Sequence, residues 1–64
     1  MVTVNGRSEL LPLPLTLEAL LRQIDPQHPF VVARNGDVVP RHRYGECDLE
    51  SGDEIEIVHP AAGG

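Results

Sequence analysis

The chain has 64 residues, a length that allows one small domain with a thin hydrophobic core. Its formal net charge is −5, with ten acidic residues against five arginines and no lysine, which argues against nucleic-acid and anionic-membrane partners. A single cysteine excludes an internal disulfide, and no apolar run approaches the roughly 18 residues of a membrane span. The N-terminus lacks the features of a signal peptide, so we expect a cytoplasmic domain.

The first predicted elements are the two strands of a β-hairpin. Residues 1–4 alternate as in a short strand, Asn5-Gly6 favours a tight turn, and residues 8–11 can return antiparallel. The Pro-Leu-Pro-Leu segment at 12–15 ends this strand, because proline donates no hydrogen bond to a sheet. We interpret it as an extended connector in preference to a ligand for a polyproline-binding domain.

A helix of two to three turns is predicted next. Thr16 suits the N-cap position, and Asp25-Pro26 ends the helix because the residue before a proline avoids helical geometry. Apolar residues at helical spacing form one stripe that we assign to the core: Leu17, Leu20, Leu21 and Ile24.

The second half of the chain predicts three more strands. Residues 30–34 are nearly continuously apolar, which suits a central strand, and Asn35-Gly36-Asp37 turns the chain into a short return at 38–39. Residues 41–48 indicate a loop or a single helical turn. Leu49 is an isolated apolar anchor, and Ser51-Gly52-Asp53 indicates a third turn.

The last predicted strand covers residues 54–59 and alternates in polarity. Ile55 and Ile57 face one side, and the other side carries Glu54, Glu56 and Val58. The element order predicts a two-layer α+β domain, with one helix on a mixed sheet of four to five strands and the first and last strands parallel in its middle. The domain then covers residues 1–59, and residues 60–64 form a flexible C-terminal arm.

The sequence does not indicate an enzyme. Acidic neighbours disfavour the thiolate of Cys47, so we interpret it as a bystander and not as a nucleophile. His28, His42 and His59 have no metal-ligand spacing, and a phosphate-binding loop would need a lysine. The acids of residues 46–56 are more typical of a solvated face than of a catalytic pair. We therefore expect no catalytic residue and no metal site.

The C-terminal Gly63-Gly64 is the feature that points to chemistry. A bare carboxylate becomes an acyl donor only after activation, for example by joining to AMP from ATP. The activating enzyme must bring the terminus to the α-phosphate of ATP, and residues without a Cβ allow that close approach. Ala61 and Ala62 keep the preceding segment slim, and Pro60 stiffens it.

The ordered motifs of residues 35–64 resemble the ThiS family of sulfur-carrier proteins used in thiamine biosynthesis. That family has an Asn-Gly-x-x-Val-Pro turn, a loop, a Leu-x-x-Gly-Asp turn, an alternating strand and a terminal Gly-Gly. The matching residues are Asn35, Gly36, Val39, Pro40, Leu49, Gly52, Asp53, residues 55–58, Gly63 and Gly64. Asn5-Gly6 and the leucine-striped helix extend the resemblance over nearly the whole chain. Pro60 and Cys47 depart from the pattern.

The resemblance implies a ubiquitin-like β-grasp fold and a carrier cycle. An adenylyltransferase related to ubiquitin-activating enzymes would use ATP and Mg to convert the Gly64 carboxylate to an acyl-adenylate. A sulfur donor protein would then replace AMP, leaving a thiocarboxylate that thiazole synthase accepts. In this cycle Gly63, Ala62 and Ala61 are the tail that the activating enzyme holds, and the carrier itself binds no cofactor.

A partner surface is predicted near the arm. Six of the ten acids lie in residues 46–56, and they either steer a basic partner or serve solubility alone. The outward side chains at this surface are predicted to be Val58, Arg34, Glu54 and Glu56. Periodicity does not decide which of Val31 and Val32 faces outward, so the face of residues 30–34 that contacts partners stays open. Three alternatives stay open: a carrier for molybdopterin or cysteine biosynthesis, a β-grasp interaction module that is never activated, and conjugation of Gly64 to a lysine of another protein.

Overall fold

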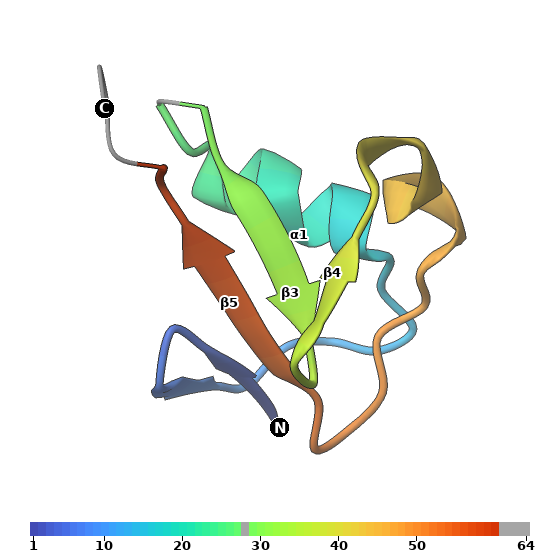
Figure 1. The fold of residues 1–64 in the computed structure, drawn as a ribbon. Helices are drawn as coiled ribbons and strands as arrows, with labels where there is room; N and C mark the ends of the chain where they lie inside the picture. Colours follow the sequence, from blue (N-terminus) through green and yellow to red (C-terminus); the bar gives the residue numbers. More distant parts are fainter. Residues whose placement is uncertain (28, 61–64) are drawn as a thin grey trace.

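The structure is a computed structural model that describes residues 1–27 and 29–60. Within these residues one mixed sheet carries an α-helix on one of its faces (Figure 1). The elements in chain order are β1 (Val2–Val4), β2 (Arg7–Glu9), α1 (Leu17–Ile24), β3 (Val31–Arg34), β4 (Asp37–Val39), the 3-10 helix η1 (Arg41–Glu46) and β5 (Glu54–Val58).

The sheet has five strands in the order β2-β1-β5-β3-β4. β5 is the central strand, parallel to β1 and antiparallel to β3. This confirms the expected parallel pairing of the first and last strands. The nearly continuous apolar segment that suggested a central strand is β3, which lies one place from the edge.

The asparagine of each Asn-Gly turn holds β5 by its side chain. Asn5 and Asn35 both have positive φ angles, 50° and 52°, which is the left-handed conformation that asparagine tolerates. The Oδ1 atom of Asn5 accepts a hydrogen bond from the Ile57 N–H at 2.7 Å, and that of Asn35 accepts one from the Glu54 N–H at 2.9 Å. Both hairpin turns therefore extend their pairing with the central strand through a side chain.

The helix begins and ends where its capping residues predict. Thr16 Oγ1 accepts a hydrogen bond from the Ala19 N–H at 3.1 Å, and Asp25 takes a left-handed conformation at the C-terminal end. The helix turns its leucine stripe onto the sheet, although Ile24 is 41% exposed at its last turn. The buried core combines the leucines of this stripe with inner side chains of the strands and of the segment between η1 and β5: Val2, Leu17, Leu20, Leu21, Val32, Cys47, Leu49, Ile55 and Ile57.

The strand boundaries are shorter than the sequence predicts. The return strand of the first hairpin ends at Glu9, before the apolar pair Leu10-Leu11, and Leu10 is 82% exposed. Residues 41–46 form the 3-10 helix η1, which contacts α1. Among residues 1–27 and 29–60, no helix is long and apolar enough to cross a membrane.

The helix–sheet contact makes a stability prediction. Leu17→Ala removes a side chain that is 0% exposed, and we expect a loss of about 2–5 kcal/mol in the free energy of unfolding. Leu10→Ala, at an 82% exposed position, should change it by less than about 0.5 kcal/mol. Urea denaturation followed by circular dichroism measures both, and equal losses would contradict this account of the core.

Candidate functional site

The residue expected to be modified, Gly64, lies outside the described residues, as do Gly63, Ala62, Ala61 and His28. The structure describes the place from which the chain leads into them. β5 runs through the middle of the sheet and ends at Val58, on the side of the molecule where the C-terminus is marked (Figure 1). A candidate site is therefore the surface around the end of β5.

The end of β5 is tied to the start of β3. Val58 pairs with Val31 at the last position of the antiparallel ladder. One residue further along, the imidazole Nδ1 of His59 lies 3.2 Å from the backbone oxygen of Pro29. His59 and Pro60 are both exposed at this point. The chain thus leaves the sheet from a defined position beside Pro29.

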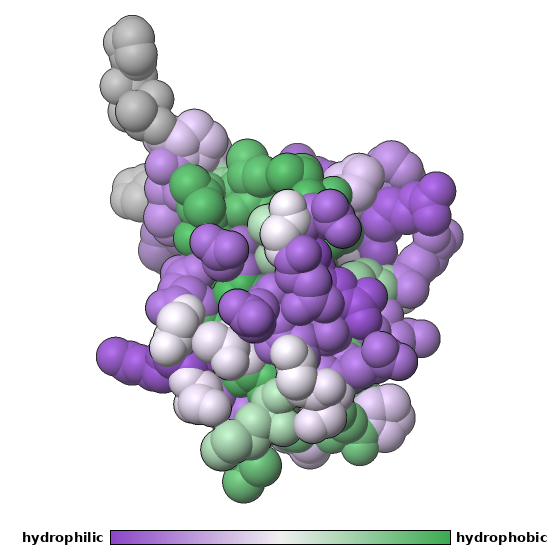
Figure 2. Space-filling view, turned by 60° about the horizontal axis from the view of Figure 1, so that its bottom comes forward, coloured by the Kyte–Doolittle hydropathy of each residue, from purple (hydrophilic) through white to green (hydrophobic). Residues whose placement is uncertain are grey.

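One face of the sheet has no helix over it, and the strand register shows which side chains share that face. In the ladder between β3 and β5, Val31 pairs with Val58 and Ala33 pairs with Glu56. In the ladder between β3 and β4, Ala33 pairs with Val38, so all of these side chains share one face of the sheet. Val31, Val38 and Val58 are 39%, 66% and 52% exposed. We call these three valines the open-face patch. Figure 2 shows hydrophobic side chains gathered on one part of the surface, between hydrophilic ones.

Two acidic side chains of β5 accompany the patch. The burial pattern of β5 alternates strictly, with Ile55 and Ile57 buried and Glu54, Glu56 and Val58 exposed. The predicted alternation of this strand is confirmed. The open-face patch therefore continues along β5 into a negatively charged surface.

An aromatic cleft adjoins the patch. Phe30 and Tyr44 stack with ring centroids 6.5 Å apart and an interplanar angle of 12°. The cleft shares two valines with the patch and has Arg41 at its rim; its lining residues are Pro29, Phe30, Val31, Val38, Val39, Arg41 and Tyr44. Sequence reasoning missed this cleft, because only the fold brings η1 beside the start of β3.

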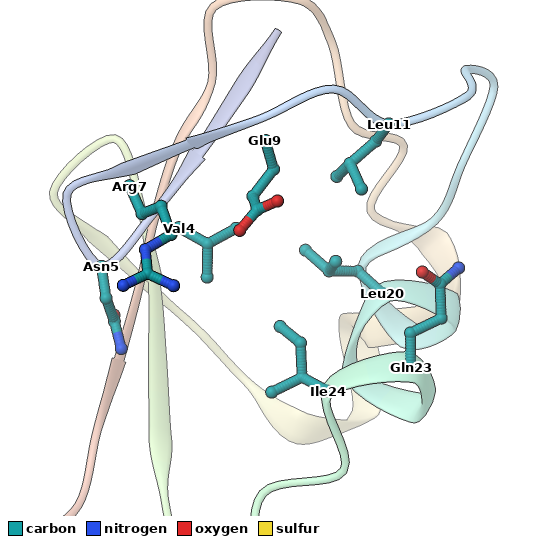
Figure 3. Close-up of a pocket in the computed structure, with 8 residues that line it drawn as sticks. All are labelled: Val4, Asn5, Arg7, Glu9, Leu11, Leu20, Gln23 and Ile24. Carbon is teal, nitrogen blue, oxygen red and sulfur yellow. The ribbon is translucent and has the colours of Figure 1, made fainter.

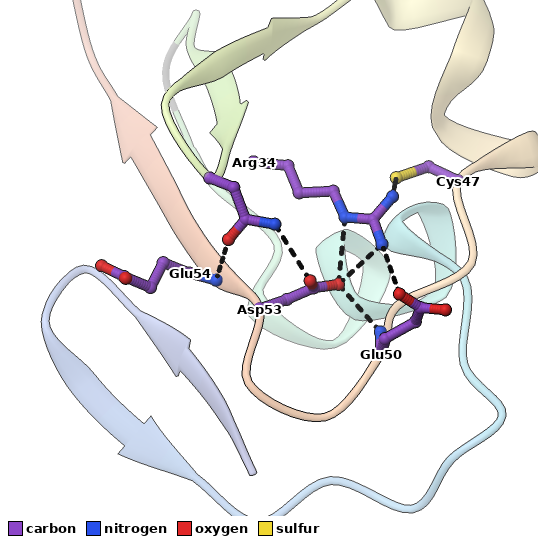
Figure 4. Close-up of polar contacts among 6 residues, drawn as sticks. Arg34, Cys47, Glu50, Asp53 and Glu54 are labelled. Carbon is purple, nitrogen blue, oxygen red and sulfur yellow. Dashed lines mark hydrogen bonds and ion pairs between the residues drawn. The ribbon is translucent and has the colours of Figure 1, made fainter.

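Arg34 does not lie on the open face, contrary to the sequence prediction. Its partner in the ladder is the buried Ile55, so its side chain belongs to the helix-covered side. Its Nε and Nη2 atoms lie 3.0 Å and 2.9 Å from Asp53 Oδ2, and its Nη1 lies 3.5 Å from Cys47 Sγ (Figure 4). Arg34 is thus held within the protein by a two-point ion pair.

Asp53 is the centre of this polar cluster and is only 6% exposed. Burial alone would raise the pKa of its carboxyl. Hydrogen bonds from the Glu50 N–H, the Asn35 amide and Arg34, together with the Arg34 charge, outweigh burial and hold the pKa below its ordinary value of 3.8. In return, the hydrogen bond to Asp53 raises the pKa of Arg34 against the effect of burial. The cluster fixes the turn before β5 to the turn after β3.

The remaining candidates are placed as follows. Cys47 is buried in the core and accepts the contact from Arg34, which fits its interpretation as a bystander. His42 is exposed on η1. In the part of the chain that the structure describes, no three His, Cys, Asp or Glu side chains are grouped so as to hold a metal ion.

A hollow of about 510 Å³ lies between the β1–β2 hairpin and α1 (Figure 3). Apolar side chains of both elements, Val4, Leu20 and Ile24 among them, point into it, and Arg7 and Glu9 lie at the hairpin side. None of its lining residues belongs to the open-face patch or to the end of β5. This hollow is therefore separate from the candidate site.

Comparisons with known proteins give the family. A model of the ThiS family matches residues 2–64. The crystal structure of the thiamine biosynthesis protein ThiS from Geobacter metallireducens is similar over 98% of this chain and 97% of that one, with 25% identity and a TM-score of 0.86. An NMR structure of a thiamine biosynthesis protein from the same organism has 28% identity, a TM-score of 0.75, and coverage of 98% and 86%. The β-grasp fold expected from the sequence is confirmed by these likenesses.

A further relative is much longer than this chain. The thiazole synthase of Paramagnetospirillum magneticum is 31% identical over 64 residues, which are 98% of this chain and 20% of the relative. The chain thus spans about one fifth of that protein.

The Asp53 cluster predicts how stability depends on pH. A carboxyl whose pKa is lower in the folded chain than in the unfolded chain stabilises the fold at neutral pH, and this contribution is lost as pH falls below about 4. Asp53→Asn should cost about 1–3 kcal/mol at pH 7 and should flatten the loss of stability toward acid. Thermal unfolding of the wild-type protein and of this variant at pH 3 to 7 measures how stability depends on pH. Asp37→Asn, at an exposed carboxylate in β4, is the control. An unchanged acid dependence in Asp53→Asn would contradict the assignment.

Proposed function

Because the chain belongs to the ThiS family, we propose that it carries sulfur as a thiocarboxylate at Gly64 for the synthesis of the thiazole of thiamine. The observation that supports this most directly is the path of the central strand. β5 ends at Val58 on an exposed rim, and the family match extends to residue 64. The carboxylate to be modified is thus joined to a compact body by the short segment that begins at His59.

The proposed chemistry has two steps, both performed by partner proteins. In the first, an oxygen of the Gly64 carboxylate attacks the α-phosphorus of ATP, which forms an acyl-adenylate and releases pyrophosphate. Mg and ATP belong to the activating enzyme. In the second, the outer sulfur of a persulfide on a donor protein attacks the acyl carbon and AMP leaves. A second thiol then attacks the inner sulfur, which breaks the sulfur–sulfur bond, releases the thiocarboxylate and leaves a disulfide. Glycine at the last two positions suits both steps, because a side chain would obstruct the approach of the acyl carbon to the α-phosphate.

The globular body serves as the part that partners recognise. The open-face patch places three exposed valines next to the strand that leads to Gly64, and such apolar surface favours protein contacts. Glu54 and Glu56 continue that face with negative charge, which suits a basic rim on the adenylyltransferase and speeds encounter. Arg34 has no direct part in this surface, since Asp53 holds it on the other side.

Thiazole synthase is the proposed acceptor of the sulfur. The relative from Paramagnetospirillum magneticum bears that name and contains a stretch similar to this chain in one fifth of its length. A protein named thiazole synthase thus contains a segment similar to this carrier. The similar solved structures are both of thiamine biosynthesis proteins. These observations favour thiamine over molybdopterin and cysteine biosynthesis as the destination.

The modified residue is tested by deletion of Gly64. Incubated with a ubiquitin-activating-type adenylyltransferase, ATP, Mg and a sulfur donor, the intact chain should exchange one terminal oxygen for sulfur. The variant without Gly64 should show no such exchange and should release no pyrophosphate. Mass spectrometry of the C-terminal peptide locates the sulfur and separates it from sulfur added at Cys47.

The control is the unfolding free energy of the deletion variant, which should equal that of the intact chain because the core residues end at Ile57. Adenylation that persists without Gly64 would refute the assigned site. Binding of the enzyme without any change in mass would indicate a passive interaction module. Covalent adducts on other proteins would indicate conjugation.

The docking surface is tested by a charge placed in the patch. Val58→Asp should raise the KM for the carrier in the adenylation assay by about tenfold, or roughly 1.4 kcal/mol, because a carboxylate would be desolvated at the interface. Leu10→Asp adds the same charge at another exposed apolar position and should leave KM unchanged. Equal effects of the two variants would show that the open-face patch is not the docking surface.

A further inference from the structure

The backbone pairing between β3 and β5 stops between two prolines. The ladder pairs Val31 with Val58, so two further residues along this register Pro29 stands opposite Pro60. Neither proline has an N–H group, and no backbone hydrogen bond can join them. Within residues 29–60, the last backbone pairing of β5 with β3 is therefore at Val58.

A side chain makes the connection that the backbone cannot make. His59 Nδ1 lies 3.2 Å from the carbonyl oxygen of Pro29; His59 is one residue beyond the last paired position of β5, and Pro29 is two residues before the first paired position of β3. A carbonyl oxygen only accepts, so Nδ1 carries the proton in this contact. The interaction joins the residue before Pro60 to the residue before Phe30.

We propose that His59 is a positioning residue, which fixes the point from which the C-terminal segment leaves the body. With His59 held, residues 60–64 span at most about 17 Å from the fixed point. Pro60 adds a fixed φ angle directly after it. A terminus presented from a fixed point loses less conformational freedom when an enzyme binds it. In this proposal His59 takes no part in the adenylation itself and acts through the direction of the chain.

This inference rests on the proposed function, and it names the residue that sets the approach to Gly64. It predicts an effect on binding of the carrier and none on the chemical step. Loss of the His59 contact should therefore raise KM for the carrier by about threefold to tenfold, the size of one net hydrogen bond, at constant kcat.

Three substitutions separate the hydrogen bond from the bulk of the ring. His59→Ala removes both. His59→Asn places an amide nitrogen where Nδ1 stands, whereas His59→Gln places it one bond further out. Wild-type KM should be restored by Asn alone. His42→Ala, at an exposed histidine on η1, is the matched control and should leave KM unchanged.

A second measurement does not depend on any partner. The Phe30 amide belongs to the same peptide group as the Pro29 carbonyl, so its NMR shift reports the hydrogen bond. This shift should move in His59→Ala and His59→Gln and return in His59→Asn. The free energy of unfolding should fall in His59→Ala and His59→Gln by no more than the contribution of one net hydrogen bond.

The outcomes distinguish this inference from the proposed function. A Phe30 shift that follows the hydrogen bond, with KM in parallel, supports positioning by His59. A moved shift with unchanged KM, a change in kcat alone, or no rescue by Asn would overturn it while leaving sulfur transfer at Gly64 intact. If wild-type protein were not adenylated, the proposed function would fail, and the positioning inference would fall with it whatever the Phe30 shift.

Discussion

The packing of α1 against one face of the sheet is the contact on which the rest of the structure depends. The helix has eight residues and covers a single face of the sheet. Alternate residues of β5 are buried because they face this helix, and the residues between them are exposed. Ile55 and Ile57 point into the core, and every second residue of the same strand is left on the surface. The burial that holds the domain together therefore also exposes Val58 and its neighbours beside the C-terminal segment.

The central strand is held by polar groups as well as by apolar ones. Asn5 and Asn35 reach it from two hairpin turns, and Asp53 joins the turn before it to Arg34. Each of these side chains provides a partner for a backbone N–H or a charged group of another element, and the bonds of Asn5 and Asp53 are partly buried. The strand that leads to the C-terminus is consequently fixed at its start, along both edges, and beside Pro29.

Much of this could be predicted from the sequence, and the exceptions share one cause. Thr16, the three leucines of the helical stripe and the alternation of β5 are local patterns, and the structure confirms them. Ile24, predicted for the same core stripe, is 41% exposed at the end of the helix. Arg34 was assigned to the wrong face, because the nearly continuous apolar run before it contains no alternation from which to choose a side. The Phe30–Tyr44 stack and the His59–Pro29 contact depend on strand register between distant segments. The proposed function rests on Gly63-Gly64, which the sequence contains but which lie outside the described residues.

The facing prolines at the end of the sheet have a consequence for how enzymes can read the terminus. An extended peptide is commonly captured by adding it as a strand to another protein, through main-chain hydrogen bonds. Pro29 has no backbone N–H with which to pair. The facing prolines thus remove one position at which β3 could compete with the binding groove of an enzyme for main-chain hydrogen bonds to the C-terminal segment.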